Sequence, residues 1–184
     1  DVEVRVAEVI GDCDELAQLV VDRYLAELDA EGFGEGAPGF MSNLVLKDRD
    51  VLVVGGGAVA ARRIPRLLDA GAKVRVVAPN LGIAVGRLAA SGAITVERRT
   101  ARAEDVGEAW YVLAASNDPN INAMIAAEAE RRHTFCCRAD DALGGTATTP
   151  TTASAGGLTV AVIGDRNPRR SVRVRDELLQ VLQD

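Results

Sequence analysis

The chain has 184 residues, of which 48% are hydrophobic and 3% aromatic, and its formal net charge at pH 7 is −6. This length suits one well-buried α/β domain with a small addition, and the scarcity of aromatic side chains argues against a nucleic-acid partner bound by base stacking. No apolar stretch approaches the length of a membrane span and no signal peptide precedes the first domain, so we expect a cytoplasmic protein with no membrane partner.

The negative charge is concentrated in the first forty residues. Residues 1–40 hold 11 acidic and 2 basic side chains, so the remainder of the chain carries a net charge of +3. Residues 2–9 predict a short strand and residues 13–28 an amphipathic helix, which is too little to bury a core. The Gly/Pro-rich composition of residues 31–39 is typical of a linker. We therefore expect residues 1–40 to be an N-terminal extension and linker, and Asp1 not to be the native start.

An apolar run over residues 51–54 ends in three glycines and restarts as a helical pattern over residues 58–70. Gly55 permits the tight turn, Gly57 lets a ligand's phosphates approach the backbone, and Ala60 lets helix and strand pack closely. A dinucleotide pyrophosphate would sit at the start of this helix, although many parallel sheets turn on glycines without binding a ligand. The cofactor-binding residues predicted here are Gly55, Gly57, Ala58 and Val59.

Strands and helices alternate beyond this loop, which is typical of a parallel sheet. The predicted strands are residues 73–77, 94–97, 110–114 and 134–137, and the predicted helices are residues 81–91 and 119–132. Residues 41–143 should therefore form an α/β domain with a Rossmann-like doubly wound parallel sheet. Ligands of such sheets bind beyond the carboxyl ends of the strands, where we expect residues 55–57, 78–80, 115–117 and 138–141 to converge.

The acidic residue that usually binds the adenosine ribose, about twenty positions after the glycines, is absent. Pro79 and Asn80 stand there instead, and no obvious arginine marks a site for a 2′-phosphate. The residues alone thus leave NAD and NADP open. We predict that Pro79, Asn80 and Ser116 contact the dinucleotide from neighbouring strand ends.

The alternation stops at residue 144. Residues 146–154 and 158–163 predict a hairpin before a final helix, so residues 144–184 should form a small C-terminal dimerisation and substrate subdomain. Residues 165–175 carry five arginines against one acid. Positive charge is unfavourable at a helix N-terminus, so this cluster favours a carboxylate or phosphate ligand, with a solvated helix start as an equally weighted alternative. Nucleic acid is the weaker candidate.

Several polar residues are interpreted as structural. Asp118 followed by Pro119 has the form of a helix N-cap with proline at the first helical position. The single histidine, His133, is expected at a helix end or on the surface, and Cys136 and Cys137 as buried small apolar residues. Neither these cysteines nor the histidine have metal-ligand spacing, so no metal site is predicted.

Four motifs occur in one order across most of the chain. They are Leu46-Lys47-Asp48-Arg49-Asp50 running into the glycine loop, Gly71-Ala72-Lys73-Val74, Ala114-Ala115-Ser116-Asn117-Asp118 with Asn122, and Phe135-Cys136 leading to Asp140. With them, residues 44 to about 182 resemble the precorrin-2 dehydrogenase family, the dehydrogenase module of siroheme synthases. The resemblance implies a homodimer that oxidises precorrin-2 to sirohydrochlorin with NAD, in siroheme or cobalamin biosynthesis. Some members are also credited with metal insertion into sirohydrochlorin, so ferrochelatase activity stays open.

The resemblance makes Asp140 the catalytic candidate, the group that takes or relays a proton while NAD accepts the hydride. Repulsion from Asp141 is expected to raise its pKa if both face the site, and a turn or cap after the strand is the structural alternative. Arg138, Arg169 and Arg170 are expected to bind the carboxylate-rich tetrapyrrole substrate, which a positively charged module attracts.

Two further interpretations accompany this one. Residues 9–17 with Arg23 and Tyr24 resemble the last helix of a small sirohydrochlorin chelatase, so residues 1–40 are interpreted as the end of an upstream chelatase domain. The rival function for the larger domain is a non-catalytic dinucleotide-binding regulatory domain. That role needs only the nucleotide cleft, whereas an enzyme also needs Asp140 and a basic pocket for the macrocycle.

Overall fold

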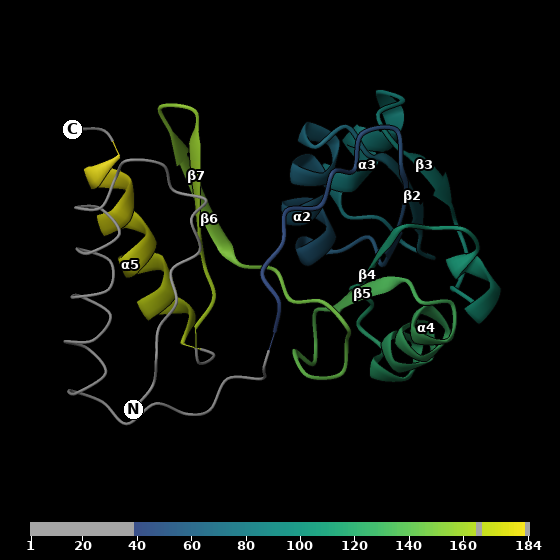
Figure 1. Ribbon diagram of the computed structural model, residues 1–184. Coiled ribbons are helices and arrows are strands. Elements are labelled where there is room, and N and C mark those ends of the chain that lie inside the picture. Colours follow the sequence, from purple (N-terminus) through teal and green to yellow (C-terminus); the bar gives the residue numbers. More distant parts are fainter. Residues whose placement is uncertain (1–38, 165–166, 183–184) are drawn as a thin grey trace. The chain divides into compact units, whose positions relative to one another are not determined.

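The computed structural model describes residues 39–164 and 167–182. The strand, helix and chelatase-like segment predicted within residues 1–38, and Arg166 of the arginine cluster, lie outside the described residues. The described part of the chain divides into two compact units, residues 39–149 and the residues from 150 on. Each unit is described by itself below (Figure 1).

The larger unit is built on a sheet of five strands. They are β1 (Asp50–Val54), β2 (Lys73–Val77), β3 (Thr95–Glu97), β4 (Tyr111–Ala114) and β5 (Phe135–Arg138). All neighbouring strands are parallel and lie in the order β3-β2-β1-β4-β5. The predicted Rossmann-like arrangement is confirmed, and the apolar run that indicated β1 is buried on both faces of the sheet, as parallel strands are.

Helices cover both faces of this sheet (Figure 1). They are α2 (Ala58–Asp69), α3 (Ile83–Ala90), the 3₁₀ helix η1 (Ala103–Val106) and α4 (Pro119–Arg131). Alternate residues of β1 enter two cores, since Val53 packs in a cluster with Ile64 of α2 and Leu52 in a cluster with Ile125 of α4. The sequence did not predict η1, because a single turn is too short to show a helical period.

The chain order reverses at β1, which lies between β2 and β4. The Gly55 N–H donates to the Val77 carbonyl at 3.0 Å, and the Ala115 N–H donates to the Val54 carbonyl at 2.8 Å. One strand farther, the Ala139 N–H donates to the Ala114 carbonyl at 2.9 Å. The carboxyl ends of these strands are thus hydrogen-bonded side by side, and the topological switch point of the sheet falls where β1 meets β4.

The second unit contains a hairpin of β6 (Thr151–Ala155) and β7 (Leu158–Val162), with α5 (Pro168–Val181) packed against it. No described residue of α5 is buried. The prediction of a strand from residue 146 is wrong over residues 146–150. There the Thr146 hydroxyl accepts from the Cys136 N–H and the Ala147 N–H donates to the Cys136 carbonyl, so this segment stays on β5. No helix within the described ranges is long and apolar enough to cross a membrane.

Candidate functional site

Gly55 ends β1 in a conformation that glycine adopts easily and other residues rarely do. Its φ is +108°, and a Cβ there would lie 2.6 Å from the carbonyl carbon of Ala115 and 2.9 Å from the nitrogen of Ser116. Both atoms belong to the backbone at the end of β4, so they cannot yield without disturbing the sheet. The fold itself therefore requires Gly55.

Gly57 is not required by the fold in this way. It is the N-cap of α2 with φ −88°, and a Cβ there would meet no atom within 4 Å. No side chain of the described residues caps this helix, and its first turn holds no acidic residue. The first N–H groups of a helix, here those of Ala58 and Val59, have no carbonyl partner within it. Open space beside these groups fits a phosphate of a dinucleotide.

The loop after β2 lies against the glycines. The Gly82 N–H donates to the Gly56 carbonyl at 2.8 Å, and a Cβ on Gly56 would lie 2.6 Å from the Asn80 carbonyl oxygen. Pro79 and Asn80 are exposed. The structure thus brings these two predicted residues to the same edge of the sheet as the glycine loop.

Ser116 follows β4 and is held by a side chain of α4. Its N–H donates to Asn122 Oδ1 and its carbonyl accepts from Asn122 Nδ2, both at 2.9 Å. The Asn122 side chain is fully buried. Sequence reasoning named Asn122 as part of a family motif and gave it no structural role. A further signal was present, because Asn122 lies on the apolar face of its helix, three and four residues before the buried Ile125 and Ala126.

Asp140 lies just past β5 in a two-point ion pair with Arg138. Arg138 Nη2 donates to Asp140 Oδ2 at 2.8 Å and Nε donates to Oδ1 at 3.2 Å. Hydrogen bonding from this guanidinium holds the pKa of the Asp140 carboxyl below its usual range. The expectation that Asp141 raises this pKa is wrong, because the hydrogen bonds from Arg138 lower it. Arg138 Nη1 also lies 3.7 Å from Asp141 Oδ2, so the same guanidinium faces both carboxylates.

Arg138, predicted to bind substrate, is therefore engaged with Asp140. The side chain of Arg138 is 12% exposed and that of Asp140 25%. The carboxylate is thus the more accessible partner of this pair.

Arg169 and Arg170 belong to the second unit, in the first turn of α5. The Asn167 side chain caps this helix by accepting from the Arg170 N–H at 3.1 Å. Arg169 is exposed, whereas Arg175, farther along the helix, donates to Asp176 at 2.9 Å and to the Thr151 hydroxyl at 2.9 Å. Part of the arginine cluster thus stabilises this unit itself.

The residues interpreted as structural occupy structural positions. Asp118 caps α4 by accepting from the Asn120 N–H at 2.9 Å, and His133 is exposed just after α4 with φ +57°. Cys136 and Cys137 are buried and free, and burial raises the pKa of the Cys136 thiol to about 11. Among the described residues, no group of His, Cys, Asp and Glu is arranged to hold a metal ion.

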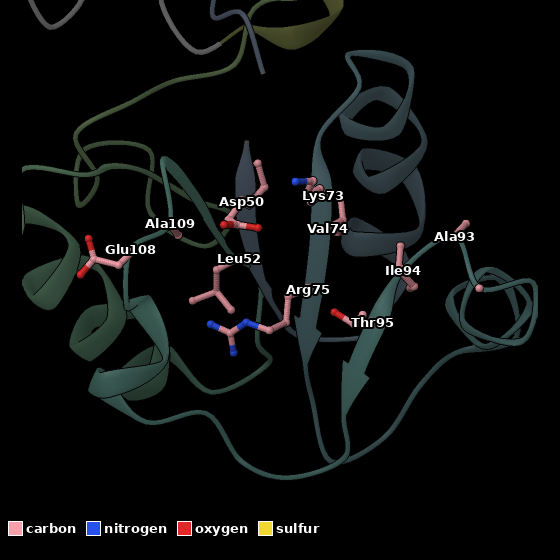
Figure 2. A pocket seen from close by; sticks show the side chains of 12 residues that line it. Asp50, Leu52, Lys73, Val74, Arg75, Ala93, Ile94, Thr95, Glu108 and Ala109 are labelled. Atoms are coloured by element: carbon pink, nitrogen blue, oxygen red, sulfur yellow. The ribbon is translucent and has the colours of Figure 1, made fainter. Parts of the chain in front are cut away.

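A cavity of about 480 Å³ lies at the opposite end of the sheet, at the amino ends of β1, β2 and β3. Figure 2 shows its lining side chains, among them Lys73, Arg75 and Glu108. Arg75 is already paired, with Glu97 at 3.0 Å and with the Asp105 carbonyl. None of the predicted site residues lines this cavity, and parallel sheets bind ligands at their carboxyl ends.

The larger unit is similar to known proteins. Residues 43–151 match a family model described as NAD(P)-binding. Siroheme synthase 1 of Serratia proteamaculans is 42% identical over 96 residues, which is 52% of this chain and 20% of that protein. Precorrin-2 dehydrogenase of Priestia megaterium is 39% identical over 82 residues, 45% of this chain and 41% of that protein. The chain thus spans less than half the length of these relatives.

A solved structure extends the likeness to most of the chain. SirC, a precorrin-2 dehydrogenase, superposes with a TM-score of 0.69 and 30% identity, covering 78% of this chain and 71% of SirC. The family model covers the whole five-stranded sheet with its glycine loop. The chain therefore belongs to the NAD(P)-binding family of the precorrin-2 dehydrogenases.

Proposed function

We propose that this chain is an NAD-dependent dehydrogenase module that oxidises precorrin-2 to sirohydrochlorin. The observation that carries the proposal is the pairing of two features at one edge of the sheet. One is the open space over Gly57 at the end of β1, and the other is the accessible carboxylate of Asp140 at the end of β5. Family membership and the likeness to SirC support the same reaction.

The residues at the switch point fit a nicotinamide dinucleotide. The N–H groups of Ala58 and Val59 would hold the pyrophosphate, because the absent side chain of Gly57 leaves room for it. Asn80 and Ser116 would flank the cofactor from the ends of β2 and β4. When bound, the nicotinamide supplies the acceptor for the hydride. We propose NAD rather than NADP on the family resemblance, since the end of β2 carries neither the usual acid nor an arginine.

Asp140 would take the proton that accompanies hydride removal. Two electrons and one proton leave the substrate as the hydride, and a second proton must go to a base. A carboxyl of ordinary acidity is ionised near neutral pH, and the Arg138 guanidinium lowers the pKa of Asp140 further, so an oxygen of the carboxylate is free of a proton when substrate arrives. Its partial exposure lets a ligand reach it.

We further propose that Arg169 and Arg170 bind carboxylates of the tetrapyrrole, and that the chain acts as a homodimer. Support for substrate binding is the lack of an acidic residue in the first turn of α5. Support for the dimer is that Leu158, at the start of β7, and Ile163, just after it, are each more than half exposed, and that no described residue of α5 is buried. Replacing both arginines with alanine should raise the KM for precorrin-2 in a salt-sensitive manner, and sedimentation should report two chains.

The direct test supplies precorrin-2 with NAD and follows sirohydrochlorin by absorbance. Asp140→Ala should abolish its formation while calorimetry still detects NAD binding, and Asp141→Ala, the neighbouring matched control, should keep most of the activity. Undiminished turnover by Asp140→Ala would remove Asp140 from its proposed role. NAD binding without any oxidation by the wild-type chain would indicate a regulatory domain instead.

A further inference from the structure

We propose that Arg138 is a positioning residue that holds the Asp140 carboxylate in one orientation, and that the loop of residues 139–147 is folded to keep its guanidinium in place. The inference rests on the proposed function, since that function gives Asp140 its use. It replaces the substrate contact predicted for Arg138 with a role inside the site.

All three nitrogens of the Arg138 guanidinium face carboxylates of the chain itself. Nε and Nη2 donate to the two oxygens of Asp140, at 3.2 and 2.8 Å, and Nη1 lies 3.7 Å from Asp141 Oδ2. The Arg138 side chain is only 12% exposed. Because its three nitrogens already have these neighbours and little of it reaches solvent, the guanidinium is placed to serve Asp140 rather than a ligand.

Two hydrogen bonds fix an orientation that one would leave free. The torsion that turns an aspartate carboxylate about its Cβ–Cγ bond has only broad preferences. A guanidinium that donates to both oxygens fixes the plane of the carboxylate as well as its position, whereas the ammonium group of lysine is a point charge without this fork. A base held in this way presents its oxygens in one direction, as proton transfer in a fixed geometry requires.

Gly144 leaves the space that the guanidinium occupies. A Cβ at this position would lie 2.6 Å from Arg138 Nη1 and 2.5 Å from Asp141 Oδ2. Gly144 is not one of the described glycines with a positive φ, so its backbone conformation suits other residues and the crowding comes from side chains alone. Both crowded atoms are the far ends of side chains, which can move. A methyl group here should therefore displace the guanidinium without unfolding the loop.

Hydrogen bonds to the sheet hold both ends of this loop. At its start, the Ala139 N–H donates to the Ala114 carbonyl at 2.9 Å. At its end, the Ala147 N–H donates to the Cys136 carbonyl at 3.0 Å. The loop thus returns along β5, which fixes the ion pair relative to the strand ends where the dinucleotide is proposed to bind.

The charges next to Asp140 come from its own strand and loop. Arg138 reaches it from the end of β5, and hydrogen bonding from this guanidinium lowers the pKa of the Asp140 carboxyl. Asp141 follows in the loop and faces the same guanidinium. Without Arg138, the two neighbouring carboxylates would lose the cation between them, and the charged form of Asp140 would be less favourable.

The test measures the Asp140 carboxyl directly, by a ¹³C NMR pH titration of the full chain with the signal assigned through Asp140→Asn. Arg138→Gln should raise the pKa of Asp140 into or above the ordinary range of an aspartate, because the hydrogen bonds to its charged form are lost. Gly144→Ala should raise this pKa by a smaller amount, because it moves the guanidinium and does not remove it.

Two matched controls should leave the pKa of Asp140 in place. Arg131→Gln breaks a two-point ion pair of the same kind, which Arg131 forms with Glu128 on α4. Gly86→Ala adds a methyl group in α3, where a Cβ would meet no atom within 4 Å.

In an active enzyme, Arg138→Lys separates positioning from substrate binding, because it keeps the positive charge and loses the fork. We expect kcat for the oxidation of precorrin-2 to fall at least about tenfold, with KM changed less than about threefold. A residue that binds a carboxylate of the substrate would instead raise KM.

A raised KM with an unchanged kcat in Arg138→Lys would overturn the proposal. So would an unchanged Asp140 titration in folded Arg138→Gln and Gly144→Ala. The titration needs no turnover, so a wild-type chain without dehydrogenase activity would refute the proposed function, while the pKa of Asp140 would still decide whether Arg138 holds its carboxylate.

Discussion

Alanine at Gly55 and at Gly57 should have opposite consequences, although the two glycines share one loop. At Gly57 a Cβ has no neighbour within 4 Å and the backbone angles suit any residue, so Gly57→Ala should change the free energy of unfolding by less than about 1 kcal/mol. The same methyl group would occupy the space proposed for the pyrophosphate. We expect NAD affinity to fall at least about tenfold, or roughly 1.4 kcal/mol.

At Gly55, alanine should instead lower the free energy of unfolding. The residue has φ +108°, which for a residue with a Cβ costs about 1–2 kcal/mol, and the new methyl group would overlap the backbone of Ala115 and Ser116. That backbone is fixed by its bonds to Val54 and Asn122, so overpacking adds about 1–3 kcal/mol. Gly55→Ala should therefore lose roughly 2–5 kcal/mol of stability.

Urea denaturation measures the free energy of unfolding, and titration calorimetry measures the affinity for NAD. Each variant serves as the control for the other, since both add one methyl group to the same loop. Wild-type NAD affinity in Gly57→Ala would refute the proposed phosphate position. A Gly55→Ala chain as stable as the wild type would refute the steric reasoning about β1 and β4.

Three further substitutions test the fold. Arg99 lowers the pKa of Asp105, so Asp105→Asn should destabilise the chain by about 1–2 kcal/mol at pH 7. The difference in stability between wild type and variant should shrink as the pH falls below about 4 and through the lowered pKa of the folded state. Equal losses of stability at pH 7 and pH 3 in urea titrations would contradict the reasoning. Ile125→Ala should cost about 2–5 kcal/mol because its side chain is fully buried, and a loss below about 1 kcal/mol in the same assay would show that the core collapses around the gap. Asp118→Ala should cost about 1 kcal/mol by removing the cap of α4, and an unchanged melting temperature would argue against that cap.

The elements of the larger unit were predictable because their signals are local. The apolar run before Gly55 predicted β1, and Asp118 before Pro119 predicted the start of α4. Strands and helices alternate along the chain, and the connections between parallel strands are right-handed as a rule. Together these two facts predict a parallel doubly wound sheet. Where the signal was weak the prediction was wrong, as for residues 146–150, whose hydrogen bonds go to Cys136 rather than to a hairpin partner.

The sequence predicted where in the fold the candidate site lies, but it did not predict the pKa of Asp140. The rule that ligands bind at the carboxyl ends of strands selected Gly57, Asn80 and Ser116 without coordinates, and the family resemblance selected Asp140. The pKa of Asp140 depends on where the Arg138 guanidinium points, whereas the sequence-based expectation considered only repulsion from the neighbouring Asp141. Side-chain direction at a strand end is set by packing, so only the structure showed that Arg138 faces Asp140.

The sequence by itself determined the sheet, the glycine loop and the family resemblance, because these depend on periodicity, backbone freedom and the order of motifs along the chain. Only the tertiary structure decided that Gly55 is required by the fold while Gly57 has open space beside it, and that Asn122 of α4 holds the Ser116 backbone at the end of β4. Those distinctions depend on atoms of Ala115 and Ser116 brought close to β1 and α4 by the fold, and sequence spacing does not report such distances.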